Sequence, residues 1–202
     1  MSAGLFEPFQ LGDLTLANRI VMAPMTRNRA DENGIVTPMM VTYYQQRASA
    51  GLIVTESAPV SRDGIGYPFT PGMYTEAQTE SWRRVTDAVH TADGHVFIQL
   101  QHCGRISHPS MLPDNATPVG PSALRPEGQA VTYTGMQDFV IPRALELREI
   151  PAIVAQFQHG AEMAKDAGFD GVEIHGANGY IIDQFLRDGS NHRPDAYGGS
   201  CL

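Results

Sequence analysis

Four short apolar segments alternate along this chain with three longer segments that have helical periodicity. The apolar segments cover residues 19–24, 52–57, 96–101 and 171–175. Strands that alternate with helices are typical of a parallel sheet whose strands are joined by crossover helices. The chain is therefore expected to fold as an α/β protein.

The three helical segments carry the capping signals expected between parallel strands. The first helix is predicted from Thr37, as its N-cap, to Ala50, with Gly51 closing it. The second is predicted over residues 77–92 and the third over residues 151–167, and a glycine follows each of them. Their apolar stripes consist of Trp82, Val85, Val89, Ile153, Phe157, Ala161 and Ala164. This order matches half of a (β/α)8 barrel, and a doubly wound sheet would give a similar pattern.

Two features favour the barrel over the doubly wound sheet. The nucleotide-binding fingerprint Gly-x-Gly-x-x-Gly is absent after the first predicted strand. Polar side chains instead follow the C-terminal ends of several strands, which is where barrel enzymes carry their active sites. The expected fold is therefore a (β/α)8 TIM barrel, to which this chain supplies roughly the first four βα units while the partner half is missing.

The length of the chain shapes the expected domain organisation. A typical barrel needs about 250 residues, whereas this chain has 202. We expect residues 1–202 to form the N-terminal part of a single barrel domain, with residues 102–149 as a capping region that includes a hairpin near 131–141. A half barrel exposes sheet edges and apolar helix surface. A second chain carrying the C-terminal half, or self-association, is therefore expected.

Composition limits which classes of partner are expected for the chain. The net charge of −8 includes no basic block, so neither nucleic acid nor an anionic membrane is an expected partner. No apolar run approaches the roughly 20 residues that span a bilayer, and the N-terminal residues lack the pattern of a signal peptide. We expect a cytoplasmic protein that binds a small molecule.

The cysteines and histidines give no sign of a metal site. Cys103 and Cys201 have the spacing of neither a zinc site nor a disulfide framework, which fits a reducing compartment and makes a bridge between them unfavoured. His102 and His108 match no strong zinc pattern either. We expect no metal, and a polar loop over the barrel mouth at residues 102–108.

Three polar side chains cluster in the sequence at the end of the last predicted strand. In a strand, alternation places Glu173 and His175 on the face opposite the neighbouring apolar residues. Asn178 and Tyr180 then follow within two glycine-containing turns. A lone histidine here would most simply be a hydrogen-bonded core residue. Three polar groups at one strand end favour a catalytic site.

Polar groups also mark two other strands. Gln99 and Gln101 alternate with apolar residues in the third strand, so both amides are expected to point inward. They suit either the edge of a planar heterocycle or a water-linked polar core. The first strand ends near Thr26, which adds a hydroxyl at the equivalent level.

Several motifs together resemble the Old Yellow Enzyme family of FMN-dependent ene-reductases. They cover residues 5–9, 16–27, 99–105, 168–180, 183–186 and 190–200 in the family's order. The resemblance implies a barrel that binds FMN non-covalently, accepts hydride from NADPH or NADH, and reduces activated C=C bonds of α,β-unsaturated carbonyls or similar electrophiles. The alternative is a non-catalytic fragment, or structural half barrel, that retains the motifs.

The resemblance also implies roles for individual residues. It places His175 and Asn178 on the carbonyl oxygen of the substrate, and makes Tyr180 the acid that protonates its α-carbon. It assigns the substrate pocket to Tyr67 and Gln101. Relatives often carry Trp at the position of Gln101, and the amide of Gln101 in place of that bulky ring is expected to enlarge and wet the pocket. The FMN contacts that it implies are Pro24, Met25, Thr26, Ala58, Gln99 and His175. The phosphate-binding loops of the barrel follow strands seven and eight, so residues 1–202 alone are not expected to close the FMN site.

Overall fold

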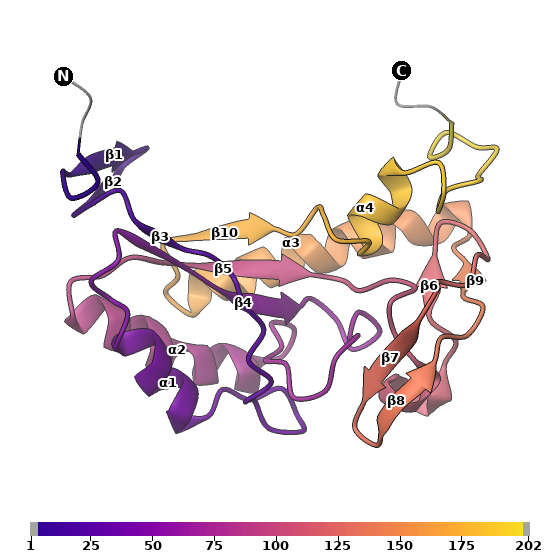
Figure 1. Ribbon diagram of the computed structural model, residues 1–202, viewed down its shortest axis with the longest axis horizontal. Helices are drawn as coiled ribbons and strands as arrows, with labels where there is room; N and C mark the ends of the chain where they lie inside the picture. The colour runs from indigo at the N-terminus through magenta and orange to yellow at the C-terminus, as the bar shows by residue number, and fades with distance from the viewer. Residues whose placement is uncertain (1–3, 200–202) are drawn as a thin grey trace. The chain divides into compact units, whose positions relative to one another are not determined.

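The computed structural model describes residues 4–199 and divides the chain into two compact units (Figure 1). The first unit comprises the residues up to Ala58, Phe69–Gln99 and Ala161–Glu173, and the second comprises Pro59–Pro68, Leu100–Gly160 and the residues from Ile174. Cys201 lies outside the described residues, and Cys103 is a buried free thiol. None of the helices formed by residues 4–199 is long and apolar enough to cross a membrane.

A four-stranded sheet forms the framework of the first unit. Its order is β10 (Gly171–Ile174), β5 (Val96–Gln101), β4 (Leu52–Pro59) and β3 (Val21–Met22). β3 pairs with β4 in parallel, and Figure 1 shows the arrows of β4, β5 and β10 pointing the same way. Three of the four predicted strands are thus confirmed almost residue for residue.

The first predicted strand is shorter than expected, because only two of its residues pair. The side-chain oxygen of Asn18 accepts a hydrogen bond from the Ile20 N–H at 3.0 Å, which removes that donor from the ladder. Pro24, at the other end, has no N–H to donate. β3 is therefore confined to Val21–Met22.

Two helices, α1 (Pro38–Gln45) and α2 (Glu76–Thr91), lie side by side in the first unit (Figure 1). The predicted bounds of α2 are confirmed, whereas the prediction that the first helix reaches Ala50 is wrong. After Gln45 the backbone changes to shorter turns, in which the Ala48 N–H donates to the Gln45 carbonyl and the Ala50 N–H donates to the Arg47 carbonyl. The side-chain N–H of Asn18 also donates to the Ser49 carbonyl at 2.9 Å. The chain therefore leaves α1 early.

The core of the first unit gathers around the predicted stripe of α2. Trp82, Val85 and Val89 are completely buried. The Trp82 indole N–H donates to the Gly72 carbonyl at 3.0 Å, and its ring packs edge-on against Phe169 at 5.4 Å. The largest side chain of the core thus has both apolar contacts and a polar partner.

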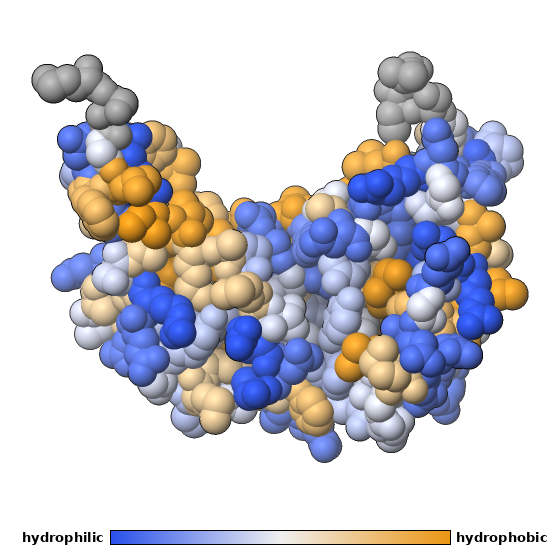
Figure 2. Space-filling view, viewed as in Figure 1, coloured by the Kyte–Doolittle hydropathy of each residue, from blue (hydrophilic) through white to orange (hydrophobic). Residues whose placement is uncertain are grey.

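A short hairpin at the start of the chain was not predicted. β1 (Phe9–Leu11) pairs antiparallel with β2 (Leu14–Leu16). Three-residue strands are too short to show a clear period of two. Figure 2 shows apolar side chains gathered over this hairpin and β3, and the exposed ones are Leu5, Phe6, Phe9, Leu11, Ile20 and Val21.

The second unit is built from short elements around an apolar cluster. The predicted hairpin is present as β7 (Gln129–Thr132) and β8 (Gly135–Asp138). β6 (Val119–Gly120) pairs in parallel with β9 (Arg143–Ala144). The remaining elements are η1 (Pro109–Met111), η2 (Pro113–Asn115), η3 (Leu147–Glu149) and α4 (Ile181–Leu186).

The third predicted helix is α3 (Ile150–Asp166), which passes from the second unit into the first. Its N-terminal part contributes Ile150 and Ile153 to the core cluster of the second unit, together with Leu145 and Ile181. Glu162 and Lys165 are exposed, as the helical period predicts.

Candidate active site

The loop after β3 presents exposed side chains above a buried carboxylate. Met25 and Thr26 are exposed and Pro24 is half-buried. The Arg27 N–H, next along the chain, donates to Glu56 Oε2 at 3.1 Å. Glu56 Oε1 accepts from the Tyr44 hydroxyl at 3.1 Å, and that hydroxyl accepts from the Glu56 N–H at 3.0 Å.

This Glu56–Tyr44 pair is shielded from water. Burial raises the pKa of the Glu56 carboxyl, and burial also raises the pKa of the Tyr44 phenol well above its usual value. Donors aimed at a buried carboxylate fix the backbone that carries them. The pair therefore holds the loop that carries Thr26.

Two more predicted residues of the first unit lie at the ends of its central strands. Ala58 is completely buried on β4, and Gln99 is buried on β5. Gln99 Nε2 donates to Glu173 Oε1 at 2.6 Å, and its oxygen accepts from the Ser57 hydroxyl. The amide thus points inward, as predicted, and protein groups set its orientation.

In the second unit, the structure brings His175, Tyr180 and Tyr67 together. Directly after β10, the backbone N–H of His175 donates to the Leu100 carbonyl at 2.9 Å. The rings of His175 and Tyr180 meet edge-on with centroids 4.8 Å apart. The Tyr180 hydroxyl donates to the Tyr67 hydroxyl at 3.1 Å.

The turn between His175 and Tyr180 sets the directions of these groups. His175 Nδ1 accepts from the Ala177 N–H at 3.3 Å, which assigns the proton of the neutral ring to Nε2. Asn178 has a left-handed φ of 59° and an exposed side chain. The Gly179 N–H donates to Asp183 Oδ2 at 2.7 Å, which ties the turn to α4.

Both phenols of this cluster keep their protons well beyond neutral pH. Burial raises the pKa of Tyr180 far above its usual value, and the neighbouring Tyr67 adds to the effect. Burial also raises the pKa of Tyr67. A phenol that stays protonated can serve as a proton donor to a stronger base.

Gln101 is buried beside a thiol. Its Nε2 donates to Cys103 Sγ at 2.7 Å. Burial raises the pKa of the Cys103 thiol to about 12, so the sulfur stays protonated and unreactive at neutral pH. The inward direction expected for Gln101 fits its burial, and the larger, wetter pocket remains a prediction.

Residues 102–108 form a loop directly after β5, as predicted, and much of this loop is buried. Its place over the barrel mouth remains a prediction. The His102 side chain is completely inaccessible, and its Nδ1 accepts from the Gly104 N–H at 3.0 Å. Its Nε2 lies 3.9 Å from Asp63 Oδ2, and this neighbour lowers the pKa of the Asp63 carboxyl. Gly104 has a φ of 58°, and a Cβ there would meet the Gln184 amide, so the segment turns inward. Among residues 4–199, no three or more His, Cys, Asp and Glu side chains are grouped to hold a metal ion.

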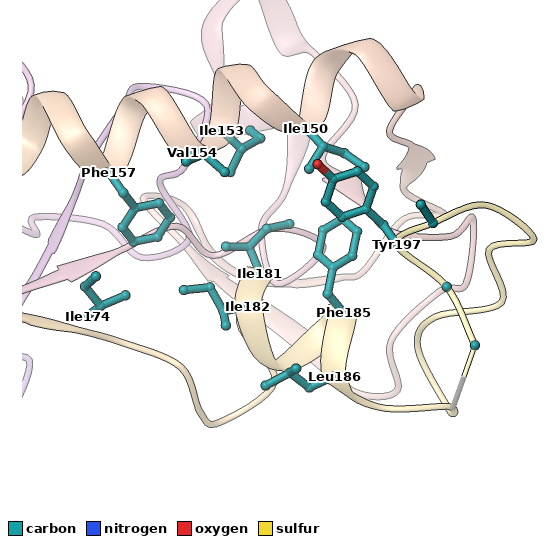
Figure 3. Close-up of a pocket in the computed structure, with 13 residues that line it drawn as sticks. Ile150, Ile153, Val154, Phe157, Ile174, Ile181, Ile182, Phe185, Leu186 and Tyr197 are labelled. Atoms are coloured by element: carbon teal, nitrogen blue, oxygen red, sulfur yellow. The ribbon is translucent and has the colours of Figure 1, made fainter. Parts of the chain in front are cut away.

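An apolar groove in the second unit was missed by the sequence reasoning. It encloses about 500 Å³ beside α3 and α4, and none of the proposed catalytic side chains lines it (Figure 3). Its walls are Ile150, Ile153, Val154, Phe157, Ile174, Ile181, Ile182, Phe185, Leu186 and residues 196–199. The signal that could have revealed it is the short segment 181–186, which has apolar residues on more than one helical face.

Comparison with known proteins matches nearly the whole chain to one family. The model of the NADH:flavin oxidoreductase / NADH oxidase family matches residues 4–201. The flavin oxidoreductase hxnT of Emericella nidulans is 46% identical over 201 residues, which are 97% of this chain and 51% of that protein. The 12-oxophytodienoate reductase 7 of Oryza sativa subsp. japonica is 45% identical over 208 residues, covering 98% of this chain and 51% of that protein.

Solved structures give the same result for the fold. An Old Yellow Enzyme homologue from Zymomonas mobilis matches with a TM-score of 0.95 and 46% identity, over 98% of this chain and 55% of that one. Morphinone reductase in complex with tetrahydroNAD matches with a TM-score of 0.94 and 46% identity, over 98% and 56%. The predicted fold is confirmed as part of a (β/α)8 barrel. The chain spans about half the length of the curated relatives it matches.

Proposed function

Because the chain belongs to the NADH:flavin oxidoreductase / NADH oxidase family, we propose that it is the N-terminal half of an FMN-dependent ene-reductase. The substrates are small α,β-unsaturated carbonyl compounds or similar electrophiles, with NADPH or NADH as the source of electrons. The observation that carries the proposal is the cluster of His175, Tyr180 and Tyr67, which joins donors and a protonated phenol at a strand end.

The residues of the first unit fit a flavin chemically. The exposed Thr26 hydroxyl offers a donor and an acceptor for the edge of the ring, and Pro24 and Met25 offer apolar surface. Ala58 and Gln99 are buried, and their contact with the ring is proposed from the family resemblance. We propose that these five residues hold FMN. When bound, FMN supplies the hydride that reaches the β-carbon of the substrate.

The residues of the second unit have roles towards the substrate. The His175 Nε2–H and the Asn178 amide donate hydrogen bonds to the carbonyl oxygen and stabilise the negative charge that develops there. Tyr180 gives its proton to the α-carbon, because its phenol is protonated at neutral pH. Removing one such donor to a developing oxyanion costs about 10²–10³-fold in rate in a well-studied protease.

We further propose that activity requires polypeptide equivalent to the other half of the relatives, either as a second chain or through self-association. The support is the coverage of about half of each relative, together with the apolar groove beside α3 and α4. The buried free thiol of Cys103 fits the reducing cytoplasm that we propose as the location.

The proposal is tested by co-expressing the chain with the C-terminal half of the Zymomonas mobilis relative. We expect a yellow complex that oxidises NADPH when a cyclic enone is added. Tyr180→Phe should leave flavin reduction by NADPH unchanged and slow enone reduction, whereas His175→Ala should also weaken enone binding. A colourless complex without enone turnover would favour the non-catalytic half barrel. Equal losses in both half-reactions for Tyr180→Phe would contradict its role as the acid.

A further inference from the structure

The two phenols of the second unit form a pair from distant parts of the sequence. The Tyr180 hydroxyl donates to the Tyr67 hydroxyl at 3.1 Å, and the ring centroids lie 6.3 Å apart at an interplanar angle of 85°. Each hydroxyl oxygen can accept and each O–H can rotate. The direction of the bond can therefore reverse without movement of either ring.

The loop that carries Tyr67 is held rigidly. The Gly64 carbonyl accepts from the Cys103 N–H at 2.9 Å, and the Ile65 carbonyl accepts from the Ser107 hydroxyl at 2.6 Å. A Cβ on Gly66 would lie only 2.3 Å from the Ile106 carbonyl oxygen. Tyr67 thus stays at a fixed position, as preorganised support requires.

Burial makes a lone phenolate costly at this place. Tyr180 and Tyr67 both have pKa values raised by burial. A phenolate left on Tyr180 needs a donor close by, because an unpaired buried charge is poorly stabilised. The Tyr67 hydroxyl already lies at hydrogen-bonding distance.

We propose that Tyr67 is a positioning residue for Tyr180, holding its hydroxyl before proton transfer and donating to its oxygen afterwards. This role rests on the proposed function. The Tyr180 O–H bond breaks as a C–H bond forms at the α-carbon, and the electron pair stays on the Tyr180 oxygen. The Tyr67 O–H then rotates towards that oxygen, and water returns the proton.

The pair is tested directly in the chain alone, without FMN. A fluorinated tyrosine, whose phenol is more acidic, replaces Tyr180, and its ionisation is followed by ¹⁹F NMR. Tyr67→Phe keeps the ring and removes two hydrogen bonds: the one that stabilises the protonated Tyr180, and the reversed one that stabilises its phenolate. Because a hydrogen bond to a charged oxygen is about twice as strong as one between neutral groups, we expect the ionisation midpoint to rise by about one pH unit, equivalent to a tenfold change. Tyr133→Phe, in the turn after β7, serves as the control and should leave the midpoint in place. A midpoint that stays or falls in Tyr67→Phe would overturn the proposal.

Kinetics of the assembled enzyme then separate support for Tyr180 from contact with the substrate. Tyr67→Phe should lower kcat for enone reduction about tenfold, with KM changed less than about threefold and flavin reduction unaffected. The double variant with Tyr180→Phe should be no slower than Tyr180→Phe alone. Additive losses, or a change in KM alone, would contradict the positioning role. An assembly that reduces no enone would sink the proposed function, while the NMR result would still decide the pairing.

Discussion

At the scale of single residues, Glu56 shows how a buried charge organises a neighbouring loop. Its carboxylate accepts from the Arg27 N–H and from the Tyr44 hydroxyl, each at 3.1 Å. A buried acceptor that loses its donor keeps the cost of desolvation, about 1–3 kcal/mol. The order of the loop carrying Thr26 therefore depends on a tyrosine in α1.

We predict that Tyr44→Phe lowers the free energy of unfolding of the first unit by about 1–3 kcal/mol. Urea unfolding followed by fluorescence measures this change, because Trp82 is the single tryptophan of the chain and lies 6.1 Å from the Tyr44 ring. Tyr43→Phe, at the adjacent half-buried position, is the matched control with an expected change within about 0.5 kcal/mol. Equal effects of the two variants would refute the role of the buried hydroxyl.

Asp63 gives a prediction for acid conditions. The neighbouring His102 lowers the pKa of the Asp63 carboxyl, so its folded pKa lies below the unfolded value of about 3.9. Its contribution to stability is therefore complete above the unfolded pKa and is lost as the pH falls through the folded pKa. Asp63→Asn should remove this pH dependence from hydrogen exchange in the second unit. Because the side chain is half exposed, the effect should be about 1 kcal/mol or less.

The sequence was sufficient for some site residues and insufficient for others. His175 and Tyr180 lie five positions apart in one motif, so strand geometry and a turn predicted their proximity, and the structure places their rings 4.8 Å apart. The partners Glu56 and Tyr44 were not predicted, because their contact depends on how α1 packs. The burial of the loop around His102 was not predicted for the same reason, since burial depends on distant segments.

At the scale of elements, Gly51 shows why the end of the first helix was misjudged. The sequence suggests that this glycine closes a helix, yet α1 ends at Gln45. A Cβ on Gly51 would lie 2.0 Å from the Asn18 carbonyl oxygen. Its N–H donates to the Asn18 side chain at 2.9 Å. The glycine is needed for close approach of two backbone segments before β4.

We predict that Gly51→Ala destabilises the first unit by more than about 2 kcal/mol, because backbone atoms must move to admit a methyl group. Gly12→Ala is the control, since Gly12 has a φ of 56° with open space around it. The control should cost only about 1–2 kcal/mol, from the left-handed conformation. Urea unfolding of both variants makes the comparison, and a smaller loss for Gly51→Ala would reject the steric argument.

At the starts of helices, the residue type and the surrounding fold also decide different things. Thr37 takes the N-cap position with Pro38 in the first turn, as predicted. Its hydroxyl, however, donates to the Arg29 carbonyl at 2.8 Å and does not cap the helix. Thr75 forms a complete capping box with Gln78 at the start of α2. A residue type thus predicts the boundary, while the surroundings decide which hydrogen bond forms.

At the scale of the whole molecule, each unit exposes apolar surface that its own residues leave uncovered. In the first unit it lies over β1, β2 and β3 (Figure 2), and in the second it forms the groove beside α3 and α4 (Figure 3). Exposed patches of this kind mark interaction sites in soluble proteins. The order of strands and helices predicted an incomplete barrel. The location of its uncovered surfaces required the packing of side chains.

The groove leads to a prediction about assembly with the other half of the proposed enzyme. Val154 lines it and is 62% exposed, so Val154→Glu should leave the circular dichroism and thermal unfolding of the chain unchanged. Covering the groove would bury the new carboxylate without a partner, which costs several kcal/mol or forces protonation. Association with the C-terminal half of the Zymomonas mobilis relative should therefore weaken at least about tenfold, or about 1.4 kcal/mol.

The matched control for this prediction is Val131→Glu, on the β7–β8 hairpin, where the valine is 40% exposed and lies outside the groove. It adds the same charge to the same unit, so a general electrostatic effect would weaken assembly equally in both variants. Titration calorimetry of each variant against the C-terminal half of the Zymomonas mobilis relative distinguishes burial of a carboxylate in the groove from a general electrostatic effect. Unchanged affinity for Val154→Glu would mean that the groove stays open in the assembled protein, and the surface needed to complete the barrel would have to be sought elsewhere.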